Sequence, residues 1–423
     1  MTDLEWDTLV LGAGVLGCAT AYHVMRSDPD RRVLLLDRNP RPAQGNTRRS
    51  VALFRDLFTS STNQALASST IALFDHVEGE LGHNLGLKRF GYYWMMDPGK
   101  LDDLRPVLED LERHGSDLEI HDRSDVRALL GEHIELDPVP PLDRGPLGSV
   151  AGAVMARNAG TLSPSRLAGW FEMEFRALGG RVEYGFTVDR LVPESVRGNG
   201  FRVWEDGRVA AVEGASGRLR AREFVVAAGA MTPSLLDPLG VDSHVKPRTR
   251  QAFGLVGEGA TALHERNGFP GGHLPVMVLP SAGVYLKPVG SQRMLLAGCA
   301  DDLGRPFGLD EDPQPEAEFL RDQIRPVVEG YLPGMKGAEV KVSWAGQYHS
   351  NTIDGNPYVF KESNLTVVAG ASGSGIMKSD AIGRVAAAVH LDQRSTELFD
   401  GHRMNVADLG IKGRKVAPEA LII

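Results

Sequence analysis

The chain has few cysteines, no excess of positive charge and no long apolar run free of glycine. Its two cysteines, Cys18 and Cys299, are too few for a disulfide framework and too far apart for a metal-type spacing, so a reducing compartment and no metal site are expected. The 55 acidic residues outnumber the 46 basic ones, and the net charge of −9 provides no basic field for nucleic acid. Glycines interrupt the one long uncharged run, residues 8–25, and acidic residues precede it. It is therefore expected to be neither a membrane span nor a signal peptide. A cytoplasmic location is expected, and docking on a membrane surface stays open.

A strand, a glycine turn and a helix are expected at the start of the chain, in "DTLVLGAGVLGCATAYHVMR". Gly12, Gly14 and Gly17 have the G-x-G-x-x-G spacing directly after the apolar run, which leaves room for a pyrophosphate against the helix N-terminus. A second apolar run, "RRVLLLDR", ends at Asp37, about where an acid binds a ribose hydroxyl. This order predicts a dinucleotide site, which NAD and FAD would both fit.

Two later segments repeat the sequence of strand, glycine loop and helix, at residues 223–236 and 364–390. Their spread along the chain favours a large flavoprotein with one nucleotide domain built from separated pieces. We expect an α/β fold, α+β in part, with a Rossmann-like cofactor domain and a substrate domain that has a mainly antiparallel sheet. The cofactor domain is expected in 1–85, 145–240 and 335–423, and the substrate domain in 86–144 and 241–334. Within the latter, "GVYLKPV" and "RMLLAGC" predict a hairpin around Gly290 and Ser291.

The order of the motifs "VLGAGVLG", "LLLDR", "VVAAGAMT", "WAGQYHSNTIDGNP" and "VVAGASGSGIMKSDAIGR" resembles the FAD-dependent amine and amino-acid oxidoreductases of the D-amino-acid oxidase superfamily. The sarcosine and dimethylglycine group has the most similar pattern. The resemblance extends from about residue 5 to about residue 390 and is specific in its combination of motifs. It implies FAD as cofactor, and hydride transfer from the carbon next to an amine nitrogen to flavin N5, leaving an imine that water hydrolyses.

The substrate implied by the resemblance is a secondary or N-methylated amino acid, or a related amine that carries a carboxylate. Two alternatives stay open: an FAD-dependent 2-hydroxyacid dehydrogenase on the same scaffold, and a non-catalytic flavoprotein assembly factor. The electron acceptor would be oxygen, a quinone or an electron-transfer protein, and the oligomeric state is not predicted. Oxidase members carry a lysine over the flavin in the strand matching "RMLLAGC"; here Leu295 and Leu296 stand there, and Lys287 lies on the neighbouring strand. A dehydrogenase is therefore favoured.

Three arginines follow the second apolar run, in "QGNTRRSVALFRDLF". Arg55, with Phe58 three residues later, matches the arginine that holds the substrate carboxylate in the resembling family. A guanidinium fork suits a carboxylate, although a salt bridge on a helix face is the plainer alternative. Arg48 and Arg49 lie where "GNT" should meet the cofactor. They are expected to contact flavin or phosphate, or else to serve in structural pairing.

Relatives that attach FAD covalently do so through a histidine or a cysteine, and the matching places here hold arginine and no cysteine. Noncovalent FAD is therefore expected. Lys378 follows the usual lysine position by one place and would point at the flavin, at the substrate or into solvent. Of Tyr92, Tyr93 and Trp94, at most one or two are expected to reach a pocket, because neighbours on a strand alternate between faces.

The residues expected to take part in catalysis are Arg55, Tyr348, His349 and Lys378. The residues expected to contact FAD are Gly12, Gly14, Val15, Leu16, Gly17, Asp37, Arg38, Asn46, Thr47, Arg48, Val188, Ala228, Gly229, Gly346, Gly373, Ser374, Gly375, Ile376 and Met377.

Overall fold

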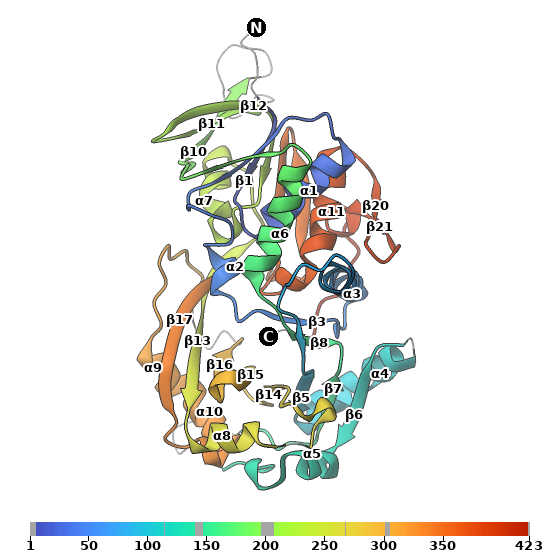
Figure 1. The fold of residues 1–423 in the computed structure, drawn as a ribbon, viewed down its shortest axis with the longest axis vertical. Coiled ribbons are helices and arrows are strands. Elements are labelled where there is room, and N and C mark those ends of the chain that lie inside the picture. Colours follow the sequence, from blue (N-terminus) through green and yellow to red (C-terminus); the bar gives the residue numbers. More distant parts are fainter. Residues whose placement is uncertain are drawn as a thin grey trace.

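The fold consists of two bodies, each built around one large sheet, and these lie one above the other in Figure 1. The computed structural model describes residues 6–113, 115–139, 147–195, 207–266, 268–300 and 305–421. Within these residues, no helix is both long enough and apolar enough to cross a membrane.

The sheet of the upper body is parallel at its centre. Its parallel strands, in spatial order, are β9 (Arg181–Tyr184), β2 (Val33–Asp37), β1 (Trp6–Leu11), β12 (Gly217–Val226) and β19 (Leu365–Ala369). Its antiparallel additions are β10 (Arg190–Ser195) and β11 (Gly207–Gly214), on the first half of β12, and β18 (Tyr358–Glu362), on β19. The central strands are apolar on both sides because both faces of the sheet are covered.

Helices cover one face of this sheet. They are α1 (Val15–Ser27), α11 (Ser379–His390) and α6 (Pro164–Ala177), and α1 packs against both of the others. Val10 and Leu35 belong to the core under these helices, whereas their neighbours Leu9 and Leu34 belong to the core on the opposite face. The period-2 alternation of strand side chains thus divides the apolar residues between two buried layers.

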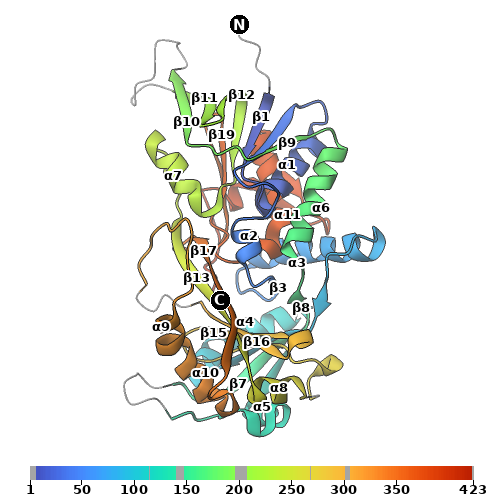
Figure 2. The same cartoon turned by 60° about the vertical axis from the view of Figure 1, so that its left-hand side comes forward.

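The sheet of the lower body is mainly antiparallel, and only β14 and β5 pair in parallel. Its spatial order is β17 (Glu339–Ser350), β13 (Lys246–Val256), β16 (Met294–Cys299), β15 (Val284–Val289), β14 (Val276–Val278), β5 (Tyr92–Met96), β7 (Gly152–Ala156) and β6 (Leu118–Asp122). The predicted hairpin is confirmed, since β15 and β16 pair antiparallel across Gly290–Gln292. Figure 2 shows the long strands β13 and β17 reaching from the lower body to its junction with the upper one.

Smaller elements complete the molecule. A small sheet of β3 (Leu53–Arg55), β8 (Ala159–Thr161) and β4 (Lys88–Arg89) lies near the junction. The remaining α-helices and strands of the described residues are α2 (Asn46–Arg49), α3 (Ser61–Asp75), α4 (Pro98–Arg113), α5 (Arg123–Leu130), α7 (Thr232–Leu236), α8 (Glu258–His264), α9 (Ala317–Phe319), α10 (Arg325–Tyr331), β20 (Ser395–Glu397) and β21 (Arg403–Asn405).

The arrangement is the predicted α/β fold, α+β in part, with a Rossmann-like sheet assembled from distant segments. Sheet membership departs from the expected ranges in two places. The range 145–240 contains β7 and the range 335–423 contains β17, and both strands pair within the lower sheet.

Candidate active site

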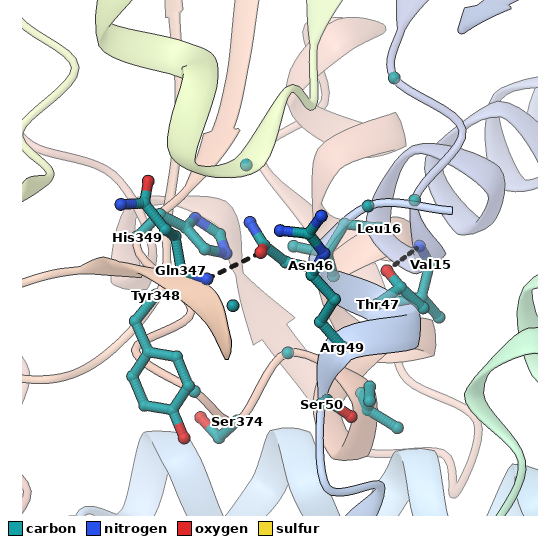
Figure 3. Close-up of a pocket in the computed structure, with 18 of the residues that line it drawn as sticks. Val15, Leu16, Asn46, Thr47, Arg49, Ser50, Gln347, Tyr348, His349 and Ser374 are labelled. Atoms are coloured by element: carbon teal, nitrogen blue, oxygen red, sulfur yellow. Dashed lines mark hydrogen bonds between the residues drawn. The ribbon is translucent and has the colours of Figure 1, made fainter. Parts of the chain in front are cut away.

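A cavity of about 620 Å³ lies between the two bodies. Its walls come from the turn after β1, the end of β2, α2, β3, α3, β13, β15, β17 and the loop that precedes α11. Figure 3 shows residues of α2 on one side of this cavity and residues of β17 on the other. The cavity therefore has a cofactor-domain wall and a wall from the lower sheet.

The glycine turn after β1 forms one end of the cavity. Gly12 has φ +106°, and a Cβ on it would lie 2.6 Å from the carbonyl oxygen of Ala227. A Cβ on Gly17 would lie 1.8 Å from the carbonyl oxygen of Gly12, so glycine there lets α1 pack onto the turn. Gly17 does not line the cavity, and its requirement is one of packing.

The N-terminus of α1 opens into the cavity. Its N-cap, Gly14, provides no side-chain cap, and the Val15 amide donates to Thr47 Oγ1 at 3.1 Å. By helix geometry the amides of Leu16 and Gly17 have no carbonyl one turn earlier within the helix. Free amides at a helix N-terminus suit an anion such as a pyrophosphate.

Asp37 stands at the end of β2 on the cavity wall. Its Oδ2 accepts the amide of Ala13 at 2.7 Å, and its Oδ1 accepts the amide and side-chain nitrogen of Asn39 at 2.8 and 2.9 Å. These bonds hold the carboxylate beside the glycine turn. The predicted contact of Asp37 with a ribose hydroxyl requires this position. The neighbouring Arg38 lines the cavity and pairs with Glu311 at 3.4 Å.

Helix α2 is tied to β17 across the cavity. Asn46 Oδ1 accepts the amide of Gln347 at 2.8 Å, as the dashed line in Figure 3 marks. Arg49 lines the cavity and pairs with Asp312 at 2.9 Å. Its neighbour Arg48 does not line the cavity. Of the two adjacent arginines, Arg49 is therefore the one that lies on the cofactor side.

Arg55, at the end of β3, is buried at the far end of the cavity. Its guanidinium donates to the carbonyl oxygen of Leu57, and to that of Leu421 at 2.5 Å. It lies over the rings of Phe58 and Trp94, at 4.1 and 5.0 Å from their centroids. Burial lowers the pKa of Arg55, although a guanidinium stays protonated in proteins. Within the described residues no carboxylate forms an ion pair with it, so the helix-face salt bridge is not what is found.

Lys378 is fully buried and lines the same end of the cavity. Its Nζ donates to Asn63 Oδ1 at 2.6 Å and to Ser374 Oγ at 2.7 Å, and it lies 4.2 Å from the centre of the Phe58 ring. Burial holds the pKa of Lys378 well below its ordinary value; the charge of Glu419 raises it again in part, and the charge of Arg55 lowers it. Lys378 therefore does not point into solvent, and its burial favours the uncharged amine.

Tyr348 and His349 of β17 both line the cavity. In Figure 3 the phenol of Tyr348 points toward Ser374, and burial raises its pKa. His349 Nδ1 accepts the amide of Gly370 at 3.1 Å, which leaves the proton of the neutral ring on Nε2. Burial lowers the pKa of His349 to about 4, so the ring is neutral near pH 7.

The aromatic residues of β5 alternate as expected. Tyr92 lines the cavity, and Trp94 on the same face stacks on Arg55. Tyr93 faces the opposite core, where its hydroxyl bonds His121 Nδ1 at 3.1 Å. One of the three residues thus reaches the cavity.

The strand that carries Leu295 and Leu296 does not line the cavity; the neighbouring strand β15 contributes Tyr285 instead. Lys287 is also outside it, and its Nζ donates to the carbonyl oxygen of Val51 at 2.6 Å. The leucines that replace the lysine of oxidases on this strand therefore do not form part of the cavity wall.

All the residues expected to take part in catalysis line the cavity, as do all those expected to contact FAD except Gly17 and Arg48. The lining also contains residues that sequence reasoning missed, among them Asn63, Arg250, Glu419 and Leu421. Arg250 of β13 donates to the carbonyl oxygen of Ala300 at 2.8 Å and lies 5.3 Å from the ring centre of Tyr348. It stands in a segment without a motif, where only the paired strands reveal its position.

The cavity fits a flavin dinucleotide on its own features. It joins a glycine turn and open helix amides at one end to aromatic and cationic side chains at the other. Gly373 belongs to the loop before α11, where a Cβ would lie 2.4 Å from the Tyr348 ring. The close approach of loop and strand therefore needs glycine.

Comparisons with known proteins point the same way. A family model described as FAD dependent oxidoreductase matches residues 7–389. Glycine oxidase of Bacillus licheniformis is 24% identical over 396 residues, which cover 90% of this chain and 92% of that protein. FAD-dependent oxidoreductase domain-containing protein 1 of Xenopus laevis is 27% identical over 161 residues, 36% of this chain, and the match spans only 29% of that protein.

A further similar protein is the peroxisomal sarcosine oxidase of Homo sapiens, 25% identical over 238 residues, 56% of this chain and 54% of that protein. Among solved structures, L-proline dehydrogenase from P. horikoshii superposes with a TM-score of 0.72 over 91% of this chain and 93% of its own, at 18% identity. At that identity the likeness concerns the fold.

Proposed function

The chain belongs to the FAD dependent oxidoreductase family, and from this premise we propose that it oxidises the C–N bond of a secondary or N-methylated amino acid or related carboxylate-bearing amine. The family resemblance in the motif order is confirmed, and FAD is the cofactor. When bound, FAD supplies the acceptor for a hydride. The proposal includes noncovalent FAD, because no cysteine stands among the described lining residues and the His349 ring is engaged by Gly370. It also includes a cytoplasmic location, which suits the two buried free cysteines.

The observation that carries the substrate class is the buried guanidinium of Arg55. A buried charge is costly unless an opposite charge compensates it. Among the described residues, Arg55 donates to backbone carbonyls and lies over aromatic rings, and the carboxylates of Glu419 and Asp56 act on it through space without an ion pair. A substrate carboxylate would supply a directly bonded counter-charge through a charge-assisted, bidentate contact. Aromatic residues beside it, Tyr92 and Phe58, would enclose the substrate and exclude water.

Lys378 is proposed to take a proton from the substrate nitrogen. An ammonium group has no lone pair to form the C=N bond, so it must lose a proton before the neighbouring carbon gives up its hydride. The lowered pKa favours the neutral amine, which has two N–H groups, and Lys378 donates to two acceptors, Asn63 and Ser374. Its lone pair therefore remains for a proton.

Tyr348 and His349 are proposed to orient the reactants. Both are neutral near pH 7, since burial raises the pKa of the phenol and lowers that of the imidazole to about 4. Each therefore offers one polar hydrogen, from the hydroxyl and from Nε2, without adding charge to the cavity. Such groups position the reacting carbon rather than change the protonation of the substrate.

The test is anaerobic mixing of the purified holoenzyme with panels of amines and 2-hydroxyacids while the flavin absorbance is followed. N-methylated or secondary amino acids are expected to bleach the flavin, and the same amines without a carboxylate are expected to bleach it poorly. Bleaching by 2-hydroxyacids alone would replace the proposal with a hydroxyacid dehydrogenase. Bleaching by neither panel would favour a non-catalytic flavoprotein.

A further inference from the structure

The last described segment of the chain returns to the cavity. Arg414 pairs with Asp354 through two contacts of 2.8 Å, and the carbonyl oxygen of Ala417 accepts Asn356 Nδ2 at 3.1 Å. The amide of Glu419 donates to the carbonyl oxygen of Asp354 at 3.0 Å. The segment is thus anchored to the connection between β17 and β18 before it reaches the cavity wall.

Glu419 fixes the next part of the segment. Its carboxylate is 8% exposed and accepts the amides of Thr59 and Ser60 at 3.0 and 3.1 Å and Asn63 Nδ2 at 3.3 Å. These donors lie at the start of α3, where a negative charge is favourable. Glu419 therefore anchors the segment firmly.

Beyond this anchor, Leu421 lies directly on the substrate side of the cavity. Its carbonyl oxygen accepts Arg55 at 2.5 Å, and its fully buried side chain packs in the apolar cluster that includes Tyr92 and Trp94. Ala420, between anchor and cavity, is exposed. The segment thus offers Arg55 a hydrogen-bond acceptor oxygen and places an apolar side chain beside it. An amino-acid ligand would offer the same two groups.

We propose that residues 420–421 occupy the carboxylate subsite on Arg55, and that a carboxylate substrate must displace the Leu421 carbonyl to bind. The inference rests on the proposed function, in which Arg55 holds the substrate carboxylate. A carboxylate binds a guanidinium more strongly than a neutral carbonyl does, whereas burial of the leucine side chain favours the closed position. Because the two compete for one group, the segment lowers the apparent affinity for carboxylates. Glu419 stays in place and acts as the hinge.

The first experiment measures binding of acetate and benzoate to the FAD-loaded enzyme by the change in flavin absorbance. In a chain that ends after Glu419, the Kd is expected to fall about 10-fold or more, because the competing hydrogen bond to a charged group is gone. Leu421→Ala, which keeps the whole segment and only shortens the buried side chain, is expected to lower the Kd by a smaller factor. Lys415→Ala, at an exposed position of the same segment, is the matched control and should leave the Kd unchanged.

Hydrogen exchange provides a second readout in the full chain. The amides of Ala420 and Leu421 donate to Thr59 Oγ1 and Glu419 Oε1, at 2.8 and 2.9 Å. Saturating benzoate is expected to speed their exchange, whereas a segment that stays in place would keep them protected.

The outcomes separate the two proposals. If Arg55→Met abolishes carboxylate binding but neither the shortened chain nor Leu421→Ala tightens it, the competition is refuted and the carboxylate clamp stands. Weaker binding in the shortened chain would make the segment part of the substrate wall and would also refute the competition. If Arg55→Met binds acetate normally, the clamp itself is wrong.

Discussion

Arg55 is the side chain on which the substrate class depends. Arg55→Met is expected to retain the flavin while kcat/KM for a carboxylate-bearing amine falls roughly 30- to 1000-fold, since a charge-assisted bidentate contact contributes about 2 to 4 kcal/mol. Steady-state kinetics on such a substrate and on its analogue without a carboxylate would measure this, and the analogue should be little affected. Equal losses on both would show that the variant disturbs β3 and its bonds to Leu57 and Leu421 instead.

Lys378 gives a prediction with a pH signature. Lys378→Met is expected to lower kcat/KM near pH 7 by roughly 100-fold, because the base proposed for the substrate nitrogen is then removed. The loss should shrink as the pH rises toward the pKa of the substrate ammonium, where water already holds the amine neutral. A pH–rate profile of both enzymes is the measurement. A loss that stays constant with pH would assign Lys378 to packing beside Phe58.

The sequence predicts those residues of the site that belong to a local pattern. The glycine turn with Asp37 is recognisable because a short segment contains the strand, the turn and the acid together. Glu419 and Leu421 carry no such pattern, since their role comes from a return of the chain to α3 and β3. Arg48 and Arg49 are adjacent, and sequence reasoning cannot distinguish their roles. Neighbours on a helix differ by about 100° in direction, and the sequence does not tell which one faces the cavity.

At the scale of elements, α2 provides a matched pair of variants. Arg49→Met is expected to weaken FAD binding several-fold, because Arg49 lines the cavity while its ion pair with Asp312 is exposed and contributes little. Arg48→Met, one residue away and outside the lining, is expected to leave it unchanged. Titration of the apoprotein with FAD would measure both. A larger effect at position 48 would reverse the orientation of α2.

Some strand pairs join segments that are adjacent in the sequence, and others join segments that are far apart. The hairpin of β15 and β16 follows from two adjacent apolar runs and a short turn, so the sequence predicts it. The placement of β7 and β17 in the lower sheet depends on partners distant in the chain: β17 pairs with β13, which begins at Lys246, and β7 pairs with β5 and β6. Division of the chain into contiguous ranges cannot anticipate such exchanges between the two bodies.

For the whole enzyme, we expect slow reaction of the reduced form with oxygen and fast reaction with an artificial acceptor. Within the described lining, Lys378 is the only lysine, and burial disfavours its charged form. The lysine that lies over the flavin in oxidases, according to the resemblance, has Leu295 and Leu296 in its place here. Stopped-flow reoxidation in air, compared with turnover, is the measurement. Reoxidation as fast as turnover would contradict the dehydrogenase assignment, and the Lys378→Met variant would then show whether this lysine takes part.

The stability of the whole molecule should decline in mild acid before its carboxylates titrate. His390 is fully buried, its Nε2 bonds Thr8 Oγ1 at 2.8 Å and its Nδ1 bonds Thr366 Oγ1 at 3.1 Å, and burial lowers its pKa to about 4 from an ordinary value of 6.5. Between these two values the unfolded chain binds a proton that the folded protein does not, so the free energy of unfolding is highest above pH 6.5 and falls as the pH falls.

The full shift of His390 corresponds to about 3 kcal/mol, lost between pH 6.5 and pH 4. Urea unfolding at pH 7, 6, 5 and 4.5 would measure the decline. His390→Gln is expected to be less stable at pH 7, because it replaces a ring bonded on both sides, but to lose less stability on acidification. His402→Gln, at an exposed position, is the control and should keep the steep decline. Equal slopes in the wild type and His390→Gln would mean that His390 does not stay neutral in the folded protein, and that other buried groups cause the acid sensitivity.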